Sequence, residues 1–166
     1  MCSSDLDAGA LLSINHPVLD LGDACIGCAW ENAVPEDLAA IEIATGGWDA
    51  AGQLFDEAAI AYWDALLDEG YHLAAVGGSD DHSAGTGTGT FDSAIGSPTT
   101  LVEVDTLSRS AILEGIRRGR TVVKLQGPDD PMVVLSSEPA ADGDTVTAEN
   151  VRFIATVTGG DGAWEI

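Results

Sequence analysis

The sequence is short of basic residues. It contains 6 Lys and Arg against 28 Asp and Glu, a formal net charge of −22 at pH 7, and Lys124 is its only lysine. Binding to nucleic acid or to an anionic lipid surface relies on Lys and Arg, so we expect no nucleic acid and no membrane among the partners. Because 45% of the residues are hydrophobic, the acidity does not indicate disorder, and we expect a folded chain.

Long apolar runs and several common functional signatures are missing as well. No apolar run approaches the ~20 residues that a membrane helix needs. Three cysteines do not make a disulfide framework, and Cys25 and Cys28 are half of a four-thiolate zinc site without a second half. The sequence has no Gly-x-Ser-x-Gly elbow. The GTGTGT run at residues 85–90 has no Walker lysine and no strand-to-helix setting, so we interpret it as a loop.

The order of strand and helix patterns predicts an α/β fold. Short apolar runs predict strands at residues 10–15, 39–45, 72–78, 98–104 and 121–125. Apolar side chains at steps of three and four predict a helix over residues 53–69. A second helix is expected after Ser108, which can cap it, with Leu107 and Ile112 as a hydrophobic staple. A strand–helix–strand order is typical of parallel βα units.

The pattern changes near Gly127–Pro131, beyond which only strand signals follow. We place a domain boundary there. Residues 10–126 are expected to form an α/β domain, and residues 131–166 the beginning of a β-rich one. Residues 1–9 show no structural pattern, and we expect them to be an artefact or a disordered leader.

Polar side chains follow or interrupt three of the predicted strands. His16 follows the first, Glu42 interrupts the second, and Asp80 and His82 follow the third. In α/β barrels the carboxyl ends of the strands meet on one face, so His16, Asp80 and His82 could bind a metal ion together. Residues at i and i+2 share a face, so Asp80 and His82 point together. Asp81 then points away and is a candidate to orient an imidazole N–H.

Each of these residues also has an ordinary structural interpretation. A histidine before a proline is usually a turn residue, and an Asp-Asp-His run is usually a solvated turn. Glu42 alone could be a salt-bridged core acid. We interpret His72 as structural. Arg120, just past a predicted helix end, is the candidate contact for an anionic substrate.

Several segments resemble the polymerase-and-histidinol-phosphatase (PHP) family, in the branch that includes carbaryl-hydrolase-like metallohydrolases. These segments, all within residues 10–125, are SINHP, AIEIATGGWD, YWDALLDEGYHLAAVGGSDDHS, GSPTTLVEV and ILEGIRRGRTVV. The resemblance implies the C-terminal half of a distorted (β/α)7 barrel, followed by the start of a β-sandwich. It also implies a metal-dependent hydrolase with a multinuclear centre of Zn, Mn or Fe. Its substrate would be a small-molecule phosphoester or, alternatively, a carbamate or related ester.

The resemblance assigns roles to individual residues. His16 matches a late metal-binding His of the family, and Asp80 and His82 match its terminal Asp-x-His ligands, which would hold the metals that activate water for catalysis. Glu42 matches the acid of a hydrophobic-Glu-hydrophobic strand and is expected, with Asp81, to support the ligands.

The sequence departs from the family pattern in two respects. The only histidines are His16, His72 and His82, so the family's opening His-x-His pair has no counterpart. We therefore expect an N-terminally truncated fragment with little or no catalysis of its own. Ala44 and Thr45 stand where the family often has an aromatic residue and Asn. A non-catalytic, barrel-derived binding module remains the alternative.

Overall fold

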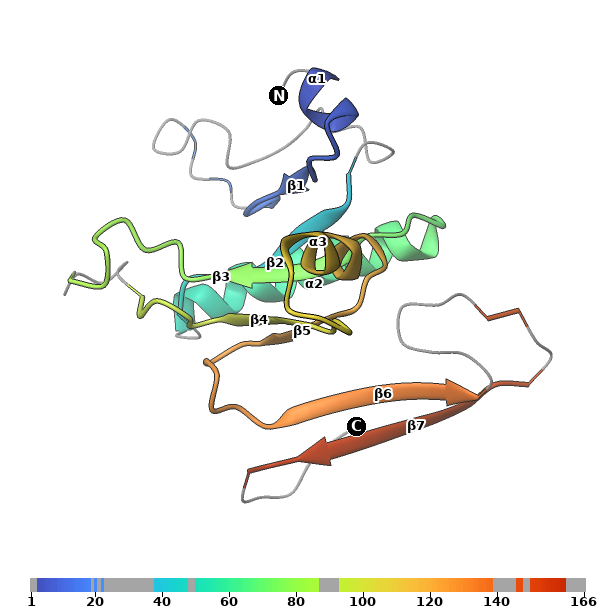
Figure 1. Ribbon diagram of the computed structural model, residues 1–166. Helices are drawn as coiled ribbons and strands as arrows, with labels where there is room; N and C mark the ends of the chain where they lie inside the picture. Colours follow the sequence, from blue (N-terminus) through green and yellow to red (C-terminus); the bar gives the residue numbers. More distant parts are fainter. Residues whose placement is uncertain are drawn as a thin grey trace.

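The computed structural model shows a mixed α/β chain with three small sheets (Figure 1). It describes residues 3–18, 20, 22, 38–47, 50–86, 93–138, 146–147 and 150–160. The elements in chain order are α1 (Ser3–Asp7), β1 (Ser13–Ile14), β2 (Ala40–Thr45), α2 (Ala50–Asp68), β3 (Ala74–Gly78), β4 (Thr99–Val102), α3 (Arg109–Arg117), β5 (Thr121–Lys124), β6 (Met132–Glu138) and β7 (Arg152–Thr158). The α/β prediction is confirmed at this level. None of the sheets in the described part closes into a barrel.

The first sheet is parallel and follows the chain order β1-β2-β3. Its register aligns Ile14 with Ile41 and Ile41 with Ala75, and all three side chains are buried. Strands covered in this way lack polar alternation, which is why their sequences read as short apolar runs. The predicted parallel pairing is confirmed here, and the carboxyl ends of all three strands lie at one edge (Figure 1).

Helix α2 packs along this sheet. Leu66 of the helix lies in one core cluster with Ile41 and Leu73, and Trp63 Nε1 donates a 2.8 Å hydrogen bond to the Leu73 carbonyl oxygen. Gly70 follows the helix at φ 94, a left-handed conformation that favours glycine and ends the helix. The helix predicted over residues 53–69 is confirmed, with a start three residues earlier.

Strands β4 and β5 pair antiparallel, so the expectation of another parallel unit was wrong at this point. The reason lies in α3, which folds back onto the preceding strand. A Cβ added at Gly115, near the end of the helix, would lie 2.6 Å from Cγ1 of Val102, the last residue of β4. The helix therefore ends beside the end of β4, and β5 runs back along that strand. Ser108 caps α3 by accepting a hydrogen bond from Ala111 N, as predicted. The staple is wrong, because Leu107 is 91% exposed.

Strands β6 and β7 form an antiparallel pair of their own. The predicted boundary at residues 127–131 falls between β5 and β6. Within residues 1–9, the segment expected to be an artefact or a disordered leader, residues 3–7 form α1, and Arg117 Nη2 donates to the Gly9 carbonyl oxygen. Cys25, Cys28 and residues 87–90 lie outside the described residues. No described helix combines the length and apolarity needed to cross a lipid bilayer.

Candidate functional site

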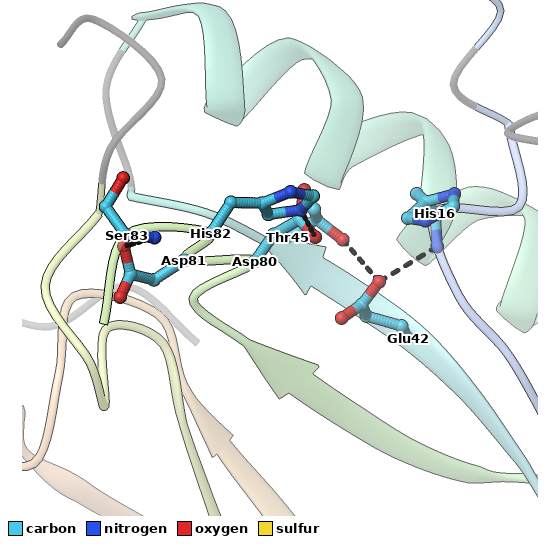
Figure 2. Close-up of polar contacts among 7 residues, drawn as sticks. All are labelled: His16, Glu42, Thr45, Asp80, Asp81, His82 and Ser83. Atoms are coloured by element: carbon cyan, nitrogen blue, oxygen red, sulfur yellow. Dashed lines mark hydrogen bonds and ion pairs between the residues drawn. The ribbon is translucent and has the colours of Figure 1, made fainter. Parts of the chain in front are cut away.

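The predicted site residues gather at the carboxyl edge of the parallel sheet. His16 follows β1, Glu42 lies within β2, and Asp80 follows β3. Figure 2 shows the Glu42 carboxylate bonded to the backbone nitrogen of His16, with Asp80 and His82 on the neighbouring loop. Three segments that are distant in the sequence therefore bring two imidazoles and two carboxylates to one edge.

Two of these residues have an uncommon backbone conformation. His16 has φ 38 and Asp80 has φ 50, the left-handed region that non-glycine residues seldom adopt. Each such residue costs on the order of 1–3 kcal/mol, so it persists only where surrounding contacts hold it. Strain of this kind concentrates at functional sites. The sequence carried no signal of it, because neither position is a glycine.

Glu42 supplies the contact that holds His16. Its Oε2 atom accepts a 2.9 Å hydrogen bond from the His16 backbone N–H and a 2.6 Å bond from the Thr45 hydroxyl. Glu42 is only 8% exposed, and this burial raises its pKa, while the two hydrogen bonds oppose the rise and the charge of Asp80 adds to it. No ion pair to Glu42 exists among the described residues, so it is not the salt-bridged core acid of the ordinary interpretation.

Asp80 and His82 form a second, more open pair. His82 Nε2 lies 3.1 Å from Asp80 Oδ1, and the two side chains are 83% and 48% exposed. They point together, as their spacing predicted. Asp81 has a different environment from the one expected: its oxygens accept hydrogen bonds from the backbone N–H groups of Ser83 and Gly85. Asp81 thus holds the loop that carries His82, and its hydrogen bonds to described residues go to backbone N–H groups rather than to an imidazole.

The donors present at this edge fit a metal that takes nitrogen and oxygen ligands. His16 Nδ1 is buried and has no hydrogen-bond partner among the described residues, although a buried polar atom normally has one. Asp80 and His82 add a carboxylate and an imidazole, which suit Zn, Mn or Fe. Within the described part of the chain, however, no three His, Cys, Asp or Glu side chains are gathered closely enough to hold an ion as they stand.

Sequence reasoning missed one residue of this region, Asp56. It is 1% exposed, its Oδ1 accepts a 3.0 Å hydrogen bond from Thr45 N, and its Oδ2 has no partner in the part of the chain that the structure describes. Burial raises the pKa of Asp56 to about 6, and the charge of Glu42 contributes. The available signal was spacing: Asp56 precedes Ala59 by three residues and Leu66 by ten, which places it on the buried face of α2.

Arg120 does not belong to this edge. Near the start of β4, the Thr100 hydroxyl forms hydrogen bonds with the backbone of Gly77 in β3. Arg120 lies past the other end of β4, where its carbonyl oxygen accepts a hydrogen bond from the backbone N–H of Glu103. There it lines a cleft of about 580 Å³ between the β4–β5 pair and β6, and its Nε is buried without a partner. The structure thus places Arg120 at the end of β4 away from Gly77, and its contact with a substrate stays a prediction. His72 lies before β3, at the opposite end of that strand from Asp80.

Comparisons with known proteins do not identify a family. No protein-family model, no curated protein and no solved structure matches this chain significantly. The resemblance to the PHP family therefore stays a prediction that rests on the sequence segments quoted above.

Proposed function

We propose that this chain carries part of the active site of a metal-dependent hydrolase of the phosphoesterase type. The observation that carries the proposal is the convergence of His16, Glu42 and Asp80 at the carboxyl edge of three adjacent parallel strands, with a left-handed backbone at His16 and Asp80. Strained backbone clusters at active sites, and the catalytic residues of α/β barrels lie at the carboxyl ends of the strands. Both features are present at this edge.

In the proposed site, His16 Nδ1, the Asp80 carboxylate and the His82 imidazole hold divalent Zn, Mn or Fe. When bound, these ions lower the pKa of a coordinated water and stabilise negative charge that develops on phosphorus or carbonyl oxygens. Glu42 keeps His16 in place by accepting a hydrogen bond from the backbone N–H of His16. A net charge of −22 repels an anionic substrate, and bound cations offset that repulsion locally.

We extend the proposal to the finer architecture. The parallel order β1-β2-β3, with α2 covering the sheet, fits the C-terminal half of a distorted (β/α)7 barrel. The pair β6–β7 fits the start of a β-sandwich, because it exposes the apolar side chains of Val133, Leu135 and Phe153, which a second sheet would cover.

The test is a calorimetric titration of the chain with Zn²⁺, Mn²⁺ and Fe²⁺ at high salt, which screens nonspecific attraction of cations to the acidic surface. We expect His82→Ala and Asp80→Asn to weaken binding at least about tenfold, because each removes a proposed ligand. His72→Ala is the matched control and should leave the affinity unchanged. Equal affinities of the parent chain and the His82→Ala variant would refute the proposal.

A turnover assay separates the alternatives. The metal-loaded chain is offered an aryl phosphodiester, an aryl N-methylcarbamate and an aryl acetate, and only slow turnover is expected because three histidines leave few ligands for a multinuclear centre. Faster hydrolysis of the carbamate or acetate would favour the ester-hydrolase alternative. The non-catalytic binding module draws support from the absence of a three-donor cluster in the described residues. Metal binding without turnover of any substrate, in a chain extended to include further ligands, would favour that module.

A further inference from the structure

A continuous set of contacts links the buried helix α2 to His16. Asp56 Oδ1 accepts from the backbone N–H of Thr45, and the Thr45 hydroxyl donates to Glu42 Oε2 at 2.6 Å. The same Glu42 oxygen accepts from the backbone N–H of His16 at 2.9 Å. Three elements, α2, β2 and the segment after β1, are therefore connected through one threonine and two buried acids. Figure 2 shows the part of this connection that runs from Thr45 through Glu42 to His16.

An irregularity in β2 makes this connection possible. In a regular strand, residues three apart such as Glu42 and Thr45 point to opposite faces and cannot bond. The pairing of β2 with β3 shifts register between Glu42 and Ala44, where one extra residue is accommodated. A bulge of this kind redirects a side chain. Here it brings the Thr45 hydroxyl to the side of the strand on which the Glu42 carboxylate lies.

The second carboxylate oxygen of Glu42, Oε1, lies near Gly78 of β3. A Cβ added at Gly78 of β3 would lie 3.5 Å from Glu42 Oε1, so the neighbouring strand passes close to that oxygen. The carboxylate is held through Oε2, which accepts from two donors, while Oε1 lies on the side of Gly78, where no side chain stands. The left-handed conformation of His16 depends on that carboxylate, because it accepts the hydrogen bond of the His16 N–H.

We propose that Thr45 is a positioning residue, which fixes the Glu42 carboxylate and through it the backbone and imidazole of His16. The part of this inference that concerns metal affinity rests on the proposed function, whereas the part that concerns His16 does not. Thr45 itself touches neither metal nor substrate in this account. Asp56 anchors the backbone of Thr45 and so completes the link to the core.

The experiment compares Thr45→Val with Thr45→Ser in the full chain. Valine keeps the shape and strand preference of threonine but lacks the donor, and serine keeps the donor. The first readout is hydrogen exchange of the His16 amide without metal, for which we expect protection to fall at least about tenfold in Thr45→Val and to change little in Thr45→Ser. The second is the affinity for Zn²⁺, expected to fall about 10- to 100-fold in Thr45→Val only.

The two readouts separate the two proposals. Unchanged protection of the His16 amide in Thr45→Val overturns the positioning role, whether or not metal binds. If the His16 amide loses protection in Thr45→Val while the chain binds Zn²⁺ as tightly as before, the role of Thr45 in positioning His16 as a metal ligand is overturned. A loss of protection in a chain that binds no metal supports the positioning of His16 and contradicts the proposed function. If Thr45→Val does not fold, as judged by circular dichroism, Thr45→Ala provides the same comparison with less bulk.

Discussion

Replacement of Asp56 by Asn should change how the stability of the protein depends on pH. Asp56 is almost fully buried, and only one of its carboxylate oxygens has a partner. Its pKa is raised from an ordinary value of 3.8 to about 6, mainly because burial disfavours the charged form. The folded state therefore holds this proton more tightly than the unfolded state does.

The size and sign of this pH dependence follow from the coupling between folding and proton binding by Asp56. The stabilising contribution of protonated Asp56 is fully present below pH 3.8 and is lost as the pH rises through about 6. A pKa difference of about two pH units corresponds to about 3 kcal/mol, of which about 2 kcal/mol falls between pH 4.5 and pH 8. Asn imitates the neutral acid at every pH. The free energy of unfolding of Asp56→Asn, relative to the parent chain, should thus increase by about 2 kcal/mol over that interval.

The assay is urea unfolding of both proteins at several pH values, followed by circular dichroism. Any constant cost of a buried amide without a full set of partners, about 1–3 kcal/mol, cancels because only the change with pH is compared. Asp64→Asn removes one charge from an exposed position of the same helix and controls for the net charge. A difference between Asp56→Asn and the parent chain that stays constant from pH 4.5 to pH 8 would refute the reasoning.

Two further predictions concern α3 and use the same unfolding assay. Gly115→Ala should destabilise the protein by about 1–3 kcal/mol despite the higher helix propensity of alanine, because the new Cβ would lie 2.6 Å from Val102 Cγ1; a gain in stability would show that the helix does not pack so closely on β4. Ser108→Ala should cost about 1 kcal/mol, because it removes the acceptor for the N–H of Ala111; Ser108→Asp should restore most of it, and equal stability of all three proteins would contradict the cap.

The elements that local sequence patterns determine were predictable. Helix α2 has apolar residues at helical spacing and a glycine after its last turn, and Ser108 marks the start of α3. The apolar runs of β2 and β3 end where polar residues begin. The sequence alone therefore assigns His16, Asp80 and His82 to strand ends.

Features that depend on contacts between segments were not predictable. The antiparallel return of β5 depends on the position of the end of α3, where Gly115 lies against Val102 at the end of β4, and no periodicity reveals this contact. The bulge that turns Thr45 toward Glu42 depends on the pairing of β2 with β3. Arg120 was predicted as a substrate contact because it stands just past a helix end, but the pairing of β4 with β5 places it at the end of that pair away from Gly77.

The most direct test of the account is an NMR titration with Co²⁺, whose paramagnetism broadens the signals of nearby nuclei. The chain has only three histidines, His16, His72 and His82, so each imidazole can be followed separately in a ¹H–¹⁵N spectrum. If the carboxyl edge of the parallel sheet is a metal site, the signals of His16 and His82 should broaden together at substoichiometric Co²⁺ while those of His72 stay sharp. Broadening of His82 alone, equal broadening of all three imidazoles, or no broadening would contradict the account.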